Sequence, residues 1–599
     1  MSEQVNQSPL PGMGAIVAEG GVGFRVWAPH ADSVSVIGDF NDWDGDANPL
    51  DSEDNGYWYG FVDGARTGQG YKFHLVNGDF EADRIDPYAQ AVTNSVGHGI
   101  IHDHSQFDWE GDSANCPPHH ELVIYEMHVG TFFREDSQEE VGGFDDVASH
   151  LDHLVGLGVN AIQVMPVAEF AGDLSWGYNP AHIYAVESAY GGPDAFKDLV
   201  KQAHRRGLAV ILDVVYNHFG PSDLDLWQFD GWSENDKGGI YFYNDHRSAT
   251  PWGDTRPDYG REEVRRFIHD NAMMWLRDYH IDGLRLDMTP YMRSVDGSGF
   301  DLDEGWSLMR WITETVRNDF PGRITIAEDL HGHDRVVGLE DWGAGFHAQW
   351  DAEFVHPVRE ALTAMRDEHR SLAEVRAAIE HTYDGDPIRR VIYTESHDEV
   401  ANGSARVPHE IDEVDSEGYH AKKRSTIGGA LVMTSPGIPM IFQGQEVLEG
   451  GWFTDDDPLD WERNARFRGI ELLYRNLIDL RLNRSGHTRG LTGRGLNVFH
   501  VNDDDNVLGF HRWFDGGPGD DVVVVVNLSN NSYEGYRMGM PAEGLWKLRL
   551  NSDAKAYSPL FGDFDSFDVT AFHEEDDDLP AHANIDIGPY TVLIYSQEA

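Results

Sequence analysis

Three acidic residues, Asp287, Glu328 and Asp398, each stand at the end of an apolar, strand-like run of this chain. The strands of a parallel barrel deliver side chains to the catalytic rim at such ends. Retaining cleavage of a glycosidic bond needs two carboxyl groups about 5–5.5 Å apart, one protonated and one ionised. We therefore expect Asp287 and Glu328 to form such a pair and Asp398 to shape the substrate.

One basic residue stands where it could set the protonation of this pair. Arg285 precedes Asp287 by two positions, and the side-chain period of two in a strand points both residues the same way. The guanidinium would keep Asp287 ionised, whereas Glu328 must begin the reaction protonated. The surroundings of Glu328 should therefore raise its pKa.

Other polar and aromatic residues lie next to apolar runs in the same way. His397 directly precedes Asp398, and the segment Asp213–His218 leaves a further run and enters a long irregular stretch. The segment Trp176–Pro180 offers aromatic rings, against which sugars stack their C–H faces. Long insertions at the catalytic end of a barrel usually form binding subsites.

Apolar runs and amphipathic helical stretches alternate through the middle of the chain, and this alternation predicts an α/β fold. Eight such units indicate a parallel (β/α)8 TIM barrel, which we assign to residues 111–488. The predicted strands are Leu122–Glu126, Ala161–Met165, Leu208–Asp213, Gly283–Asp287, Ile324–Glu328, Gly345–Trp350, Arg390–Thr394 and Ile438–Gln443.

Short alternating strands separated by Gly, Asp and Asn turns flank the barrel on both sides. They predict an N-terminal β-sandwich at residues 1–110, with a loose terminus up to about residue 20, and its segment Trp27–Asp44 resembles a carbohydrate-binding module. They also predict a C-terminal all-β domain at residues 489–599. The strands expected in the C-terminal domain are Leu496–His500, Val507–Trp513, Asp521–Asn527, Trp546–Asn551 and Thr591–Ser596.

Four segments, in chain order, resemble the shared motifs of the α-amylase superfamily, glycoside hydrolase family 13. The resemblance extends over roughly residues 20–599, because the flanking domains fit as well. The four segments are Trp176–Pro180, Asp213–His218, Gly283–Asp287 and Glu395–Glu399.

This resemblance implies a role for each site residue. Asp287 would be the nucleophile that forms a covalent glucosyl–enzyme, Glu328 the acid/base, and Asp398 the group that binds sugar hydroxyls and favours the distorted sugar. Asp213 and Asn217 would be structural supports. The residues implied to bind substrate are Arg285, His218, His397, Tyr178 and Trp176.

Resemblances within the family point in two directions. Ser396–Val400 and Pro458–Trp461 resemble 1,4-α-glucan branching enzymes, whereas Glu328–Asp329 and Gly345–Trp350 favour maltooligosyl trehalose trehalohydrolases. Met288–Tyr291 also departs from the small residues usual in branching enzymes. We expect a glucan-transferring enzyme of the branching type, with a glucan hydrolase (α-amylase or trehalohydrolase) as the alternative. A non-catalytic glucan-binding protein is a third reading, which the intact acids oppose.

Transfer would require acceptor subsites that outcompete water. Trp452, Phe453 and Trp461, after the eighth predicted strand, are candidate rings for such subsites. The alternative is that these rings anchor loops on the barrel.

The charge balance limits the partners of the chain. With 104 acidic and 45 basic residues the net charge is −59, which would repel nucleic acids and anionic membranes. The expected partner is an α-glucan or a maltooligosaccharide, with no nucleic acid and no membrane. The acidic surplus resembles proteins of salt-loving archaea and favours a halophilic source, where salt screens the charge.

The cysteine count and the N-terminal stretch bear on cofactors and on cellular location. A single cysteine, Cys116, leaves neither a disulfide nor a cysteine metal site within the chain. No cofactor or metal is expected; calcium remains possible, although we find no EF-hand spacing. The polar stretch Met1–Gly21 lacks the apolar run of a signal peptide, so a cytoplasmic enzyme is expected.

Overall fold

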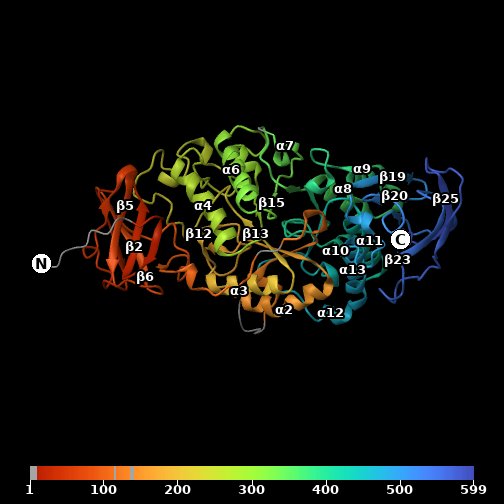
Figure 1. The fold of residues 1–599 in the computed structure, drawn as a ribbon, viewed down its shortest axis with the longest axis horizontal. Coiled ribbons are helices and arrows are strands. Elements are labelled where there is room, and N and C mark those ends of the chain that lie inside the picture. Colours follow the sequence, from red (N-terminus) through yellow and green to blue (C-terminus); the bar gives the residue numbers. More distant parts are fainter. Residues whose placement is uncertain (1–9, 114–115, 135–140, 341, 599) are drawn as a thin grey trace.

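The computed structural model describes residues 10–113, 116–134, 141–340 and 342–598. An N-terminal β-sheet module lies at one end of the elongated molecule, a barrel in the middle and an all-β domain at the other end (Figure 1). The predicted fold class, a TIM barrel flanked by β domains, is confirmed.

Eight parallel strands close into the barrel in the order β10-β13-β14-β15-β16-β17-β18-β9. Each corresponds to one of the eight predicted strands, with ends that differ by a few residues. All of their residues are buried, because parallel strands in such folds are covered on both faces. The strands are β9 (Ile124–Met127), β10 (Ala161–Val164), β13 (Ala209–Val214), β14 (Gly283–Leu286), β15 (Ile324–Ala327), β16 (Ala348–Trp350), β17 (Arg390–Ile392) and β18 (Ile438–Phe442).

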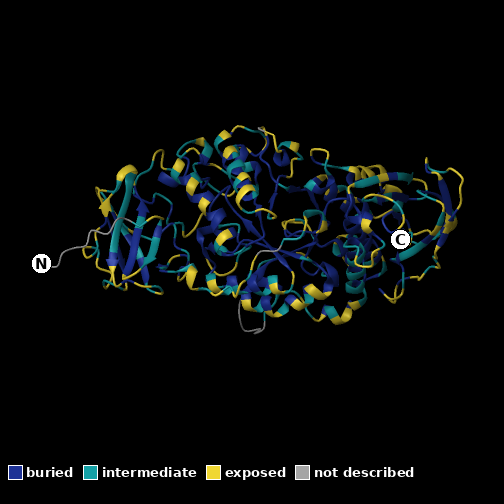
Figure 2. Cartoon of the chain, viewed as in Figure 1, coloured by how far each residue is buried: buried dark blue, intermediate teal, exposed yellow. Residues whose placement is uncertain are grey.

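Amphipathic helices cover the barrel, with their buried faces inward and their exposed faces in solvent (Figure 2). In α2 the buried residues include Phe144, Val147, Leu151 and Leu154, at the spacing of one helix face. The longer helices are α2 (Phe144–Leu157), α3 (Gly192–Arg205), α4 (Glu262–Asp278), α6 (Asp303–Asp319), α8 (Ala352–Thr363), α9 (Leu372–Glu380), α11 (Tyr419–Thr434) and α13 (Arg468–Arg481). The short ones are α1 (Val129–Phe132), α5 (Pro290–Arg293), α7 (Asp334–Val337), α10 (Val407–Ile411) and α12 (Arg463–Arg466).

Two insertions extend the barrel after β10 and β13. The first is an antiparallel pair, β11 (Ala168–Phe170) and β12 (Pro180–Val186), and its connection carries the aromatic segment Trp176–Pro180. The second is the long irregular stretch from residue 215 to residue 261, between β13 and α4. Both insertions contribute residues to the cleft described below.

The N-terminal module contains two sheets of order β1-β2-β5-β4 and β3-β6-β7, with β8 paired to β6. The expected loose terminus is wrong for residues 14–18, because β1 pairs antiparallel with β2 through its backbone; residues 1–9 lie outside the described residues. The strands are β1 (Gly14–Ala18), β2 (Gly21–Trp27), β3 (Ser33–Gly38), β4 (Asp51–Ser52), β5 (Tyr57–Asp63), β6 (Gly70–Asn77), β7 (Phe80–Arg84) and β8 (Gly99–Ile100).

The C-terminal domain is built on a six-stranded sheet of order β19-β20-β21-β26-β23-β24 and a two-stranded sheet of β22 and β25. The run Val522–Val526 is fully buried in β21, between two neighbouring strands. β22, β24 and β25 were not predicted, because each includes exposed polar residues that break an apolar pattern. The strands are β19 (Gly495–Asn502), β20 (Val507–Trp513), β21 (Val522–Asn527), β22 (Tyr533–Met540), β23 (Gly544–Asn551), β24 (Val569–Ala571), β25 (Ala581–Ile587) and β26 (Thr591–Ser596).

Among the described residues, none of the helices combines the length and the apolar character needed to cross a membrane.

Candidate active site

A cleft of about 760 Å³ opens at the C-terminal ends of the barrel strands. Its walls come from the loops after β10, β13, β14, β17 and β18, so segments far apart in sequence meet there. The predicted site residues that line it are Trp176, Tyr178, His218, Asp287, His397 and Asp398.

The register of β14 and β15 brings Asp287 and Glu328 to the same level of the barrel. Leu286 pairs with Ala327, and each acid follows directly on its own strand. Asp287 is 5% exposed and lines the cleft, whereas Glu328 is 1% exposed and lies directly behind Met288, which lines it. The two predicted carboxyls are therefore neighbours.

Arg285 lies beneath both acids and is fully buried. Its Nη1 is 3.1 Å from Asp287 Oδ1 and 2.7 Å from Asp213 Oδ2, and its Nη2 is 2.8 Å from Glu328 Oε2. Burial lowers the pKa of Arg285, but Asp213 and Glu328 outweigh burial and keep the guanidinium charged. One cation thus contacts three carboxyl groups, of which the sequence pattern indicated only Asp287.

The surroundings of Glu328 favour its protonated form at neutral pH. Its burial raises the pKa to about 8, against the opposing effect of Arg285 and with a further rise from Asp287. The Met288 N–H donates a hydrogen bond of 2.9 Å to Glu328 Oε2. Met288 reaches this position with a φ of 37°, a strained conformation for a residue with a side chain, and such strain often occurs at functional sites.

Asp398 is the ionised group on the far side of the cleft. Burial raises its pKa, but the adjacent His397 imidazole outweighs burial and holds the value at about 2. His397 Nε2 lies 3.4 Å from Asp398 Oδ2, while its Nδ1 lies 2.7 Å from Glu126 Oε1. Burial lowers the pKa of His397, but Asp398 and Glu126 together raise it well above its usual range. His397 is therefore a cation between two carboxylates.

The aromatic segment forms one wall of the cleft. The ring of Tyr178 stacks on His397 with centroids 4.9 Å apart, and its hydroxyl donates a hydrogen bond of 2.6 Å to Asp213 Oδ2. Trp176 stacks on Phe453 at 5.3 Å. Both rings are half-buried and line the cleft.

His218 and Asn217 approach Asp287 from the loop after β13. Asn217 Nδ2 donates hydrogen bonds of 2.6 Å to Asp287 Oδ2 and 2.9 Å to Asp287 O. Burial lowers the pKa of His218, which favours the neutral ring, and this ring stacks on Trp252 with centroids 4.5 Å apart. Trp252 is 39% exposed and lines the cleft.

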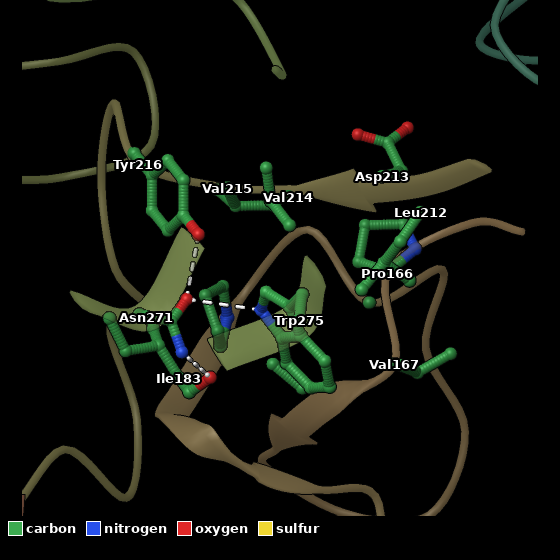
Figure 3. Close-up of a pocket in the computed structure, with 13 residues that line it drawn as sticks. Pro166, Val167, Ile183, Leu212, Asp213, Val214, Val215, Tyr216, Asn271 and Trp275 are labelled. Atoms are coloured by element: carbon green, nitrogen blue, oxygen red, sulfur yellow. Dashed lines mark hydrogen bonds between the residues drawn. The ribbon is translucent and has the colours of Figure 1, made fainter. Parts of the chain in front are cut away.

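A second set of contacts joins α4 to β12 and to the segment just after β13. Asn271 of α4 accepts hydrogen bonds from Tyr216 (2.7 Å) and Trp275 (3.1 Å) and donates one to the Ile183 carbonyl (2.8 Å) (Figure 3). The cavity between them is about 10 Å³, room for a single water. The carboxylate of Asp213 points away from this cavity (Figure 3), and this orientation leaves it free to contact the groups inside the barrel.

The three candidate acceptor rings differ in their surroundings. Trp452 is 63% exposed and lines the cleft. Phe453 is 5% exposed and packs between other rings, and Trp461 donates a hydrogen bond of 2.6 Å to the Phe132 carbonyl and lies outside the cleft. Only Trp452 of the three presents an open ring to the cleft.

Sequence reasoning missed Glu126, Trp252 and the backbone of Met288. Glu126 lies inside β9, where its neighbours are apolar and nothing in the sequence marks it as a partner of His397. Among the described residues, no three His, Cys, Asp or Glu side chains are grouped as a metal would require.

Three parts of the chain match known protein families. Residues 12–89 match carbohydrate-binding module 48 (isoamylase N-terminal domain), residues 129–246 the alpha amylase catalytic domain, and residues 499–598 the alpha amylase C-terminal all-beta domain.

Curated relatives are similar over most of the chain. A 1,4-alpha-glucan branching enzyme of Corynebacterium jeikeium is 30% identical over 91% of this chain and 78% of its own length. One of Leifsonia xyli is 31% identical over 96% and 79%, and one of Oceanobacillus iheyensis is 27% identical over 96% and 93%.

Solved structures share the fold at lower identity. Pullulanase type I from Bacillus subtilis, complexed with maltose, is 21% identical with a TM-score of 0.76, covering 98% of this chain and 86% of that one. Pullulanase from Anoxybacillus, complexed with maltotetraose, is 20% identical with a TM-score of 0.75, covering 98% and 87%.

Proposed function

The chain belongs to the α-amylase family, glycoside hydrolase family 13, and we propose that it is a 1,4-α-glucan branching enzyme or closely related glucanotransferase. It would cleave an α-1,4-glucosidic bond with retention and transfer the released chain to a glucan acceptor. The observation that carries the proposal is the contact of one guanidinium, that of Arg285, with both Asp287 and Glu328.

In the first step the carboxylate of Asp287 attacks the anomeric carbon of a bound glucan. Glu328 gives its proton to the leaving glycosidic oxygen, so that the C–O bond breaks as the covalent glucosyl–enzyme forms. The raised pKa of Glu328, about 8, keeps that proton available at neutral pH. Asn217 donates a hydrogen bond to Asp287 and orients it.

In the second step the ionised Glu328 takes a proton from the acceptor hydroxyl. The acceptor oxygen then attacks the anomeric carbon, and Asp287 leaves as a carboxylate. Asp398, held ionised beside His397, would bind the sugar hydroxyls in both steps. Tyr178 would stack on the sugar that occupies the cleft.

The choice of acceptor decides the product. A glucan 6-hydroxyl gives a branch, a 4-hydroxyl gives disproportionation, and water gives hydrolysis. Positioning an acceptor can supply an effective concentration of about 10⁵ M or more, which exceeds that of water. Trp452 is the exposed ring that would hold the acceptor chain.

Further support comes from the branching enzymes that are 30% and 31% identical to this chain over the aligned residues. Residues 1–110 would form a glucan-binding module and residues 489–599 a C-terminal domain around the catalytic residues 111–488. Glucan hydrolysis is the second candidate, because Glu328–Asp329 resembles the trehalose-releasing hydrolases of the family.

Incubation of the protein with amylose separates the candidates. New 1,6-linkages with few new reducing ends are expected for branching. Abundant reducing ends, or release of trehalose from maltooligosyl trehalose, would identify a hydrolase instead. If none of these substrates changes, the chain is a glucan-binding protein and the proposal is wrong.

A further inference from the structure

A second cavity, of about 310 Å³, lies at the end of the barrel opposite the cleft. His347 and Arg389 line it, and each directly precedes a barrel strand, β16 and β17. Parallel strands begin at one rim and deliver the cleft residues at the other, so this cavity lies at the N-terminal rim. Arg494, just before β19, closes the cavity from the C-terminal domain.

The charge of this cavity is opposite to that of the whole chain. Three arginines, Arg317, Arg389 and Arg494, line it together with the single carboxylate of Asp386. The chain carries 104 acidic and only 45 basic residues, so three arginines around one small space are unexpected. Arg317 and Arg389 are half-buried, and cations withdrawn from water need an anionic or polar partner.

Each arginine uses only part of its hydrogen-bonding capacity within the protein. Arg317 donates from Nη2 to the Gly345 carbonyl, and Arg389 donates from Nη1 to the Val337 carbonyl (3.0 Å) and to Asp384. The other guanidinium nitrogens of Arg317 and Arg389, Nε and one Nη each, have no partner among the described residues. None of these four is enclosed away from solvent. A guanidinium offers five N–H donors. The fork of Nε and Nη2 therefore remains open on Arg389, and separate donors on Nε and Nη1 remain open on Arg317.

Arg494 contributes a third, partly used guanidinium. It binds Asp386 through Nε (2.9 Å) and Nη2 (3.1 Å), and this leaves Nη1 without a partner in the described part of the chain. The Arg494–Asp386 pair also links the C-terminal domain to the barrel. A ligand in the cavity would therefore contact both domains.

A histidine adds a neutral donor. The Thr325 N–H, which can only donate, lies 3.0 Å from His347 Nδ1, so Nδ1 is the acceptor and the proton of the neutral ring is on Nε2. Burial lowers the pKa of His347 to about 3, which keeps the ring neutral. His347 Nε2 has no partner among the described residues, and the His119 ring packs edge-on against His347 at 4.9 Å.

We propose that this cavity binds a phosphate group, either as free phosphate or as a phosphate ester of a small sugar. Paired N–H groups of a guanidinium match phosphate oxygens in bidentate geometry. The Nε2–H of His347 adds a further hydrogen-bond donor to the cavity. The volume lies near the lower end of the range of ligand sites, roughly 300–1,000 Å³. Asp386 and Asp384 hold Arg494 and Arg389 in place and leave the remaining donors open.

Isothermal titration calorimetry of the full chain tests this site, with inorganic phosphate, glucose 1-phosphate and glucose at constant ionic strength. Saturable 1:1 binding of phosphate and glucose 1-phosphate, without binding of glucose, is expected. Tighter binding of the ester than of phosphate would identify a sugar phosphate as the ligand, whereas equal affinity would identify phosphate itself. Absence of saturable binding to both would overturn the proposal.

Substitutions of the cavity arginines test whether phosphate binds in this cavity. Arg317→Ala and Arg389→Ala should each weaken phosphate binding by about tenfold or more, and Arg317→Lys should weaken it less. Arg376→Ala, which removes an exposed arginine on α9 outside the cavity, should leave binding unchanged. Thermal melting with and without phosphate controls for folding. A melting shift that persists in Arg317→Ala and Arg389→Ala would place the phosphate elsewhere and refute the site.

Discussion

Arg285 Nη2 lies 2.8 Å from Glu328 Oε2 inside the barrel. A cation at this distance lowers the pKa of a carboxyl group, yet burial outweighs it and raises the pKa of Glu328 to about 8. Arg285 therefore positions the acid without removing its proton, and its Nη1 contacts Asp287 at the same time. This shared contact fixes the geometry between the two carboxyl groups.

The pKa of Glu328 predicts how activity depends on pH. The first step needs protonated Glu328, so kcat/KM should fall as pH rises through about 8. Glu328→Gln should lower kcat by about 10²- to 10⁴-fold and remove that limb of the profile. Initial rates on amylose between pH 5 and 10 would measure both, and a variant that retains the limb would contradict the assignment.

The same ionisation should affect stability. The folded-state pKa of Glu328, about 8, lies above the ordinary glutamate pKa of 4.5, so the folded protein binds more protons than the unfolded chain between these two values. The stability that Glu328 contributes is therefore fully present below pH 4.5 and is lost as pH rises through about 8. The unfolding free energy of the wild type, relative to Glu328→Gln, should therefore decline across this window in urea titrations.

Replacement of Arg285 should damage stability and catalysis together. Arg285→Lys cannot span three carboxyl groups, and breaking a buried ion pair costs about 3–5 kcal/mol. Misplacement of the acids should lower kcat by about 10²-fold or more. Arg390→Lys, which disturbs a buried pair with Asp351 outside the cleft, should lose stability but keep activity. Full activity of Arg285→Lys would show that the shared contact is dispensable.

Trp452 should control the fate of the covalent intermediate. Its exposed ring lines the cleft, and loss of one aromatic contact is worth about 0.5–1.5 kcal/mol. Trp452→Ala should therefore raise the ratio of new reducing ends to 1,6-linkages by up to about tenfold. Trp342→Ala, an exposed tryptophan outside the cleft, is the control. An unchanged product ratio in Trp452→Ala would mean that the acceptor binds elsewhere.

The net charge of −59 predicts a requirement for salt. The screening length falls from roughly 30 Å at 0.01 M to roughly 3 Å at 1 M, so self-repulsion within the acidic surface weakens. The melting temperature should rise between 0.01 M and 1 M KCl, as differential scanning calorimetry would show. Equal melting temperatures at both ends of the series would argue against a halophilic adaptation.

The barrel could be predicted from sequence because its strands are buried on both faces and read as continuous apolar runs. Arg285 and Asp287 could be paired because they are two residues apart at the end of one strand. The contact of Arg285 with Glu328 depends on the register between two strands, which a sequence pattern does not encode. The contact between Glu126 and His397 joins residues that are 271 positions apart, so no local sequence pattern could predict it. The strand β22 has no regular alternation of buried and exposed residues, and it could not be predicted either.

The central claim is that Asp287 attacks the anomeric carbon while Glu328 gives its proton to the leaving oxygen. The most direct test is mass spectrometry of peptides after incubation with a fluorinated α-glucosyl fluoride, which slows release of a covalent intermediate. A glucosyl adduct on the peptide that contains Asp287, absent in Asp287→Asn, is the result we predict. A glucosyl adduct on another residue would contradict it.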